Sequence, residues 1–163
     1  MHGFVPRFAA TLLAVLALGA ASAEALDFKP YEPGAFKQLR KAHAGRPFAL
    51  HFWSVACPPC IAELPEWAKL ARRKPGLDIV FVNVDPAADR ARAEARLEKA
   101  GLGGGTHYAF ADDFAERLYF EVDPSWRGEL PYTAFVDAKG EAVTASGALD
   151  DPALKEWLSK TAP

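Results

Sequence analysis

Residues 52–65 read FWSVACPPCIAELP, and this stretch decides the fold because both cysteines of the chain, Cys57 and Cys60, lie in it. The apolar run at 47–53 predicts a buried strand, and the pattern over 61–72 predicts a helix. The cysteines therefore lie where a strand passes into a helix, a junction at which chemistry collects in α/β folds. Their spacing places both sulfurs on one face of the first helical turn, at a separation compatible with a disulfide.

The two cysteines are expected to differ in reactivity. Cys57 falls at the helix N-terminus, where unpaired backbone N–H groups and the positive end of the helix dipole favour a thiolate over a thiol. Cys57 is therefore the candidate nucleophile. Cys60 lies one turn further along and is expected to be less exposed, placed to attack a mixed disulfide on Cys57 and release the product.

Two other interpretations of the cysteine pair stay open. A zinc site requires four ligands and would have to recruit two of His43, His51 and His107, which have no recognisable spacing relative to the cysteines. A purely structural disulfide would close a very short loop and constrain the unfolded chain little. The strand-to-helix junction and a proline far along the chain, Pro131, favour a redox-active pair.

Three motifs within residues 47–147 share the pattern of one known family. The phrase at 52–60 is similar to Phe-Trp-Ala-x-x-Cys-x-x-Cys, and 63–65 matches Glu-x-Pro after the second cysteine. The phrase LPYTAFVD at 130–137, with a glycine three residues later, is similar to a cis-proline loop and its following hairpin. The chain thus resembles the TlpA-like or ResA-like extracytoplasmic thiol-disulfide oxidoreductases of the thioredoxin fold. It departs from them at Ala56, where the family often has tryptophan.

The resemblance implies roles for residues around the cysteines. Glu63 lies on the same helix face as Cys60, where a negative charge would resist thiolate formation; the alternative is a solvated helix carboxylate. Leu130 and Pro131 are implied to bind substrate, because a cis-proline loop can present backbone groups to a peptide that adds as a strand. Trp53 is placed with these substrate-binding residues as an aromatic support beneath the active-site loop.

His51 matches neither family pattern, since thioredoxins carry a buried acid at this position and many TlpA-like proteins an asparagine. One interpretation is a neutral core histidine bonded to a neighbouring backbone group. The other starts from its place on the strand that ends just before the active-site loop. From there the imidazole could approach Cys60 and accept its proton when Cys60 attacks a mixed disulfide.

The expected fold is α/β and thioredoxin-like, a central mixed sheet with helices on both faces, built by residues 24–163. A strand at 78–84 follows the cysteine helix and completes a strand-helix-strand unit. Further elements are expected as helices at 34–44, 86–100, 114–119 and from 152 onward, and as strands at 107–111, 132–136 and 141–146. The glycines at 103–105 predict a turn, because they follow a helix and lack the ending of a phosphate-binding loop.

Residues 1–23 have the pattern of a secretory signal peptide. One arginine precedes an almost unbroken apolar run at 8–21, and small residues at 21–23 fit a signal-peptidase site, so cleavage is expected after Ala23. The alternative is an uncleaved anchor, although this run is shorter than the roughly twenty residues that span a bilayer. We expect a periplasmic protein with no membrane span after cleavage. In that oxidising compartment the pair would stay closed unless a partner reduced it.

Composition and charge narrow the function. The 163 residues are half hydrophobic and a quarter charged, with a net charge of −2 and no basic-aromatic patch, so no nucleic-acid partner is expected. The resemblance implies a thiol-disulfide oxidoreductase that acts on protein substrates without a cofactor and receives electrons from a membrane-bound donor. It further implies a reductant, for cytochrome c maturation or for delivering thiols to metal-site cysteines. The alternative is a metal-binding chaperone using Cys57, Cys60 and His51.

Overall fold

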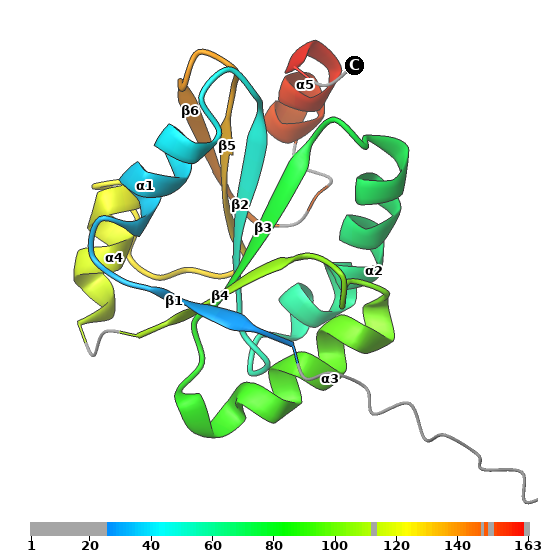
Figure 1. The fold of residues 1–163 in the computed structure, drawn as a ribbon, viewed down its shortest axis with the longest axis vertical. Coiled ribbons are helices and arrows are strands. Elements are labelled where there is room, and N and C mark those ends of the chain that lie inside the picture. The colour runs from blue at the N-terminus through cyan, green and yellow to red at the C-terminus, as the bar shows by residue number, and fades with distance from the viewer. Residues whose placement is uncertain (1–25, 112–113, 148, 150–151, 162–163) are drawn as a thin grey trace, which may run out of the picture.

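A mixed sheet of six strands runs through the centre of the fold in the computed structural model, which describes residues 26–111, 114–147, 149 and 152–161 (Figure 1). The strand order across the sheet is β1-β4-β3-β2-β5-β6. The first four of these run parallel, whereas β5 is antiparallel to β2 and β6 is antiparallel to β5. The strands are β1 (Phe28–Tyr31), β2 (Phe48–Trp53), β3 (Asp78–Asn83), β4 (Thr106–Phe110), β5 (Tyr132–Val136) and β6 (Ala142–Ser146).

Helices cover both faces of the sheet, as the sequence predicts (Figure 1). Side chains of α2, α3 and α5 enter one hydrophobic core, and side chains of α1 and α4 enter a second core on the opposite face. The helices are α1 (Ala35–Ala42), α2 (Pro58–Arg73), α3 (Arg90–Ala100), α4 (Ala115–Val122) and α5 (Pro152–Thr161), with a short 3-10 turn at Ala87–Asp89 before α3.

β2 is the strand that carries the chain into the cysteine motif, and all six of its residues are buried. It lies between β3 and β5. Because side chains alternate along a strand, Ala49 and Trp53 enter the core beneath α2, whereas Phe48 and Phe52 enter the core beneath α1 and α4. Burying each large side chain contributes roughly 1.5–3 kcal/mol. The end of β2 is therefore held from both faces, which fixes where the next residues begin.

α2 starts at Pro58 and continues to Arg73, through Pro65. The two prolines at its first positions lack N–H groups that a first helical turn leaves unbonded in any case. Its buried side includes Leu64 and Trp67, which face the sheet. The interruption that Pro65 makes in the backbone bonding is thus tolerated inside a helix that is fixed by its packing.

Several segments differ in detail from the sequence-based expectation, and α2 begins three residues earlier than the predicted 61–72. Residues 86–100 form a 3-10 turn followed by α3 instead of one continuous helix. α4 ends at Val122, three residues later than predicted. Phe28–Tyr31, where the sequence predicts no strand, forms the edge strand β1, and its Pro30 is tolerated because an edge strand has one side without a partner strand.

Some of the remaining expectations concern residues that the structure describes, and one concerns residues outside that part of the chain. The predicted hairpin of β5 and β6 is confirmed, and in the last helix Leu154 and Trp157 are buried. The predicted signal peptide, residues 1–23, lies outside the described part of the chain. Within the described part, no helix combines the length and the apolar character that crossing a membrane requires.

Candidate active site

Cys57 and Cys60 form a disulfide at the start of α2, with 2.04 Å between the sulfurs and 5.3 Å between the Cα atoms. Cys57 is the residue that caps the helix, and its Sγ accepts a hydrogen bond from the Cys60 N–H at 3.2 Å. Cys57 is half-buried, whereas Cys60 has no exposed surface. The predicted difference in exposure between the two sulfurs is therefore present.

The position of Cys57 has an electrostatic consequence for the reduced protein. Free N–H groups at a helix start and the helix dipole both stabilise negative charge there. Cys57 already accepts one such N–H, from Cys60. Such a hydrogen bond stabilises a thiolate more than a thiol. The geometry thus favours Cys57 as the sulfur that attacks.

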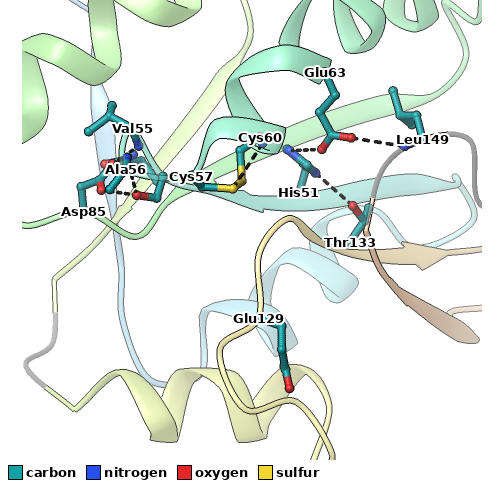
Figure 2. Close-up of a disulfide and its surroundings, with 12 residues drawn as sticks. His51, Val55, Ala56, Cys57, Cys60, Glu63, Asp85, Glu129, Thr133 and Leu149 are labelled. Carbon is teal, nitrogen blue, oxygen red and sulfur yellow. Dashed lines mark hydrogen bonds and ion pairs between the residues drawn. A yellow bond between two sulfur atoms is a disulfide. The ribbon is translucent and has the colours of Figure 1, made fainter.

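Behind Cys60, three side chains from three elements meet in the core (Figure 2). His51 of β2 has its Nδ1 2.9 Å from the Thr133 hydroxyl on β5 and its Nε2 3.3 Å from the Glu63 carboxylate on α2. The other Glu63 oxygen accepts the Leu149 N–H at 3.2 Å. His51 is 0% exposed and Glu63 6% exposed. A buried acid and a buried imidazole therefore lie side by side on the Cys60 side of the disulfide.

This arrangement corrects the contacts that were expected for the two residues. The idea that Glu63 is a solvated helix carboxylate is wrong, because its side chain is buried among the sheet, α2 and Leu149. His51 is buried, as the core interpretation expects, but its Nδ1 contacts a side chain instead of a neighbouring backbone group. Its neighbours are the side chains of Glu63, on the helix that follows β2, and of Thr133, 82 residues further along the chain.

His51 should make the stability of the protein fall in mild acid. Burial lowers the pKa of His51 from 6.5 to about 3 in the folded protein. Between those values the unfolded chain binds one more proton, so unfolding becomes easier as the pH falls, by at most about 1.4 kcal/mol per pH unit. We expect His51→Asn to flatten this slope between pH 4.5 and 6.5 in urea titrations. An unchanged slope would contradict the prediction.

The loop before β5 contains the predicted cis peptide bond, between Leu130 and Pro131. Trp126 stabilises this loop, because its Nε1 donates to the Glu129 carbonyl at 2.9 Å and its ring stacks on Tyr132 with centroids 4.2 Å apart. Continuing the register of β2 and β5 places Pro131 opposite Trp53, at the edge of the sheet where the cysteine loop begins. Leu130 packs against the core that contains Cys60.

Trp53 lies apart from any surface that a substrate could reach. Its side chain is completely buried in the core beneath α2. Its inclusion among the substrate-binding residues is therefore corrected, and its part is to support the active-site loop from below. A tryptophan at the end of a buried strand fills that role because its large apolar ring stabilises the core where the strand ends.

The sequence-based reasoning missed a second polar cluster, on the Cys57 side of the disulfide. Asp85, just after β3, accepts hydrogen bonds from the Ser54 hydroxyl at 2.5 Å and from the Val55 N–H at 2.7 Å. Asn83 also donates to it, at 2.6 Å. The signal for this cluster was the pair of polar residues at the carboxyl end of an otherwise apolar strand, the end at which α/β sites form.

The described residues contain no group of three or more histidine, cysteine, aspartate and glutamate side chains that could hold a metal ion. His51 directs its two nitrogens to Thr133 and Glu63. The structure therefore gives the metal interpretation no support.

A groove of about 510 Å³ lies between α2 and α5, with Glu63 in its wall beside Pro59 and Ala62.

The chain has a thioredoxin-like fold with a disulfide at the start of α2, and it is similar to thiol-disulfide oxidoreductases with this fold. No protein-family model matches the sequence. Sporulation thiol-disulfide oxidoreductase A of Bacillus subtilis is 25% identical, over 91% of this chain and 93% of that protein.

Solved structures agree on the fold. A secreted disulfide oxidoreductase of Mycobacterium tuberculosis, described as homologous to DsbE of Escherichia coli, has a TM-score of 0.55 at 20% identity and covers 73% of this chain and 82% of its own. A thioredoxin-like protein solved in its oxidised form has a TM-score of 0.59 at 17% identity, covering 75% of this chain and 84% of its own. The expected resemblance to the extracytoplasmic thiol-disulfide oxidoreductases is thereby confirmed.

Proposed function

We propose that this chain is an exported periplasmic enzyme that reduces disulfides in protein substrates. The observation that carries the proposal is the asymmetric pair at the start of α2, a half-buried Cys57 beside a fully buried Cys60. In the reduced enzyme the Cys57 thiolate attacks a substrate disulfide, forms a mixed disulfide and releases one substrate thiolate. Cys60 then attacks Cys57 Sγ, closes the ring and releases the second thiolate.

Each cycle transfers two electrons from the enzyme dithiol to the substrate, so the enzyme must be reduced again. A membrane-bound electron donor is the partner proposed for that step. The signal-like residues 1–23 support export, and one of the structural relatives is a secreted protein. Cytochrome c maturation and the delivery of thiols to metal-site cysteines are the two finer assignments that the family resemblance supports.

Two buried carboxylates favour the reductant direction. Glu63 follows Cys60 by one helical turn, and Asp85 binds the loop that precedes Cys57. Negative charge near a thiol disfavours its thiolate. A strong oxidant such as DsbA needs the opposite, a stabilised reduced form. The surroundings of this pair therefore support a reductant.

Leu130 and Pro131 are the proposed docking residues for the substrate. Pro131 lies opposite the end of β2, next to the loop that carries Cys57. In this position the backbone of Leu130 can pair with an extended substrate chain while the substrate sulfur meets Cys57. Ala56, exposed directly before Cys57, makes this surface smaller than a tryptophan would. That leaves room for a bulkier substrate beside the sulfur.

The Glu63–His51 pair is proposed to take up the proton that Cys60 loses. A buried thiol resists ionisation, so its attack on the mixed disulfide requires an acceptor in the same core. A neutral imidazole alone is a weak base here because burial lowers its pKa. The carboxylate 3.3 Å from Nε2 would stabilise the imidazolium that forms. The acceptor is therefore the pair, with Thr133 orienting the ring.

The reduction potential tests the direction of the reaction. Because carboxylates flank the pair, we expect a value nearer about −270 mV, as in thioredoxin, than about −120 mV, as in DsbA. Equilibration with glutathione buffers, read by alkylation and mass, gives the potential. A value at the DsbA end would make the protein an oxidase.

A further inference from the structure

Asp85 is a buried acid that takes no part in the proposed proton transfer to the Glu63–His51 pair. It lies two residues past the end of β3 and is only 6% exposed. Its Oδ1 accepts the Ser54 hydroxyl at 2.5 Å, and its Oδ2 accepts the Val55 N–H at 2.7 Å and the Asn83 side-chain amide at 2.6 Å. Both carboxylate oxygens are thus occupied by donors, two of which belong to the segment just before Cys57.

These bonds extend through the whole loop between β2 and α2. The Ala56 N–H donates to the Ser54 hydroxyl oxygen at 2.9 Å, and the Cys57 N–H donates to the Ser54 carbonyl at 3.2 Å. All three N–H groups at 55–57 are therefore directed to Asp85 or to Ser54, which Asp85 holds. Figure 2 shows Asp85 under this loop, on the Cys57 side of the disulfide and opposite Glu63.

Asp85 also has a cation linked to it. Arg90, at the start of α3, donates to the Asn83 side-chain oxygen at 2.8 Å, and the same Asn83 donates to Asp85. The Arg90 guanidinium lies over the Phe28 ring, 4.9 Å from its centroid, which holds it in place. The negative charge of Asp85 is thus offset by Arg90 only through the Asn83 side-chain amide, without a direct hydrogen bond between the two charged groups. Part of its negative charge remains effective toward the loop and toward Cys57.

We propose that Asp85 is a positioning residue that holds the Ser54–Ala56 loop and sets, with Arg90, the charge that the Cys57 sulfur experiences. The inference rests on the proposed function in taking Cys57 as the attacking thiol. Holding the loop fixes the direction from which a substrate sulfur can approach. The negative charge opposes the stabilisation of the thiolate by the helix start. Asp85 thereby keeps the pair a reductant.

The proposal predicts opposite effects for the two charged residues. Asp85→Asn removes the negative charge, so the pKa of the Cys57 thiol should fall and its thiolate fraction at pH 6 should rise about three- to tenfold, as expected for one partly screened charge. The reduction potential should become less negative. Arg90→Gln removes the cation that partly offsets the charge of Asp85. The pKa of Cys57 should then rise, its thiolate fraction should fall, and the reduction potential should become more negative. Thiolate absorbance and Cys57 alkylation, each measured against pH, give the values.

Two control variants separate charge from loop geometry. Asp78→Asn removes an exposed carboxylate at the opposite end of β3 and should leave the Cys57 pKa unchanged. Ser54→Ala loosens the loop but keeps the Asp85 charge, so it should shift the pKa less than Asp85→Asn. If Asp85→Asn does not fold, Arg90→Gln still tests the charge. Equal shifts in Ser54→Ala and Asp85→Asn, or no shift with either charge variant, overturn the proposal.

The same experiment distinguishes this inference from the proposed function. Alkylation of the wild-type reduced protein with limiting iodoacetamide should label Cys57 first. If Cys60 is labelled first, the proposed assignment of the attacking thiol fails and the inference fails with it. If Cys57 is labelled first but its pKa ignores Asp85 and Arg90, only the inference fails.

Discussion

Replacing Cys60 by serine is expected to trap protein substrates on the enzyme, whereas replacing Cys57 by serine should abolish turnover. The thiolate is the attacking species, and a serine hydroxyl at the helix start stays protonated at neutral pH. Cys57→Ser therefore cannot make the first bond to substrate. Cys60→Ser keeps Cys57 at the start of α2 but lacks the sulfur that closes the ring. The mixed disulfide then has no internal route to release.

Non-reducing gels and intact mass after mixing each reduced variant with a disulfide-bonded substrate measure this difference. Wild-type protein should show only a transient adduct, Cys60→Ser a lasting one that dithiothreitol removes, and Cys57→Ser none. The double variant is the background control. A lasting adduct on Cys57→Ser, through Cys60, would reverse the proposed roles of the two sulfurs.

The sequence predicted the parts of the fold that depend on local pattern. The apolar run before the cysteines and the β-branched run at 78–84 gave β2 and β3 within a residue at each end. Prolines at the start of α2 and at the start of α5 marked helix beginnings. β1 was missed as a strand because four residues that include Pro30 have no clear period. They form a strand only because β4 provides a partner.

From residue spacing alone, the site was predictable only where its residues are close in sequence. Cys57, Cys60 and Glu63 lie within two turns of one helix, so their spacing indicated a shared face. The partners of His51 are 12 and 82 residues away, and the contact exists only because β5 pairs with β2 in a register that sets Thr133 opposite His51. A one-residue shift would have turned that side chain to the other face.

The two polar clusters found in the structure lie on opposite sides of the disulfide, and we propose that they act on different sulfurs. Asp85 reaches the loop before Cys57, and the Glu63–His51 pair lies behind Cys60 (Figure 2). The first sulfur must attack while exposed to solvent, so its surroundings set the thiolate fraction. The second sulfur must lose a proton while buried, so its surroundings must accept one. Variants of the two clusters should therefore affect different steps of the same cycle.

His51→Asn is expected to slow the second step by roughly a hundredfold while leaving the first step nearly unchanged. A general base in the right place typically contributes about 10²–10⁴-fold. Asparagine retains a hydrogen-bonding side chain toward Thr133 or Glu63 but cannot take a proton. The attack of Cys57 on substrate uses neither group, because Cys57 ionises at the helix start on the other side of the ring. Rate loss confined to ring closure is therefore the signature of proton uptake.

Stopped-flow measurement of mixed-disulfide formation and decay between pH 5 and 8 resolves the two steps. His107→Asn provides the matched control, since His107 is also buried but bonds to the Leu102 carbonyl beside β4, away from the cysteines. In the wild-type protein, decay should depend less on pH than in His51→Asn, where the Cys60 proton must leave to hydroxide or buffer and the rate should rise with pH. Raising the buffer concentration should then partly restore the rate of His51→Asn, because a small base replaces the lost acceptor. If both steps slow equally, or if neither changes, His51 supports the core and takes no part in proton transfer.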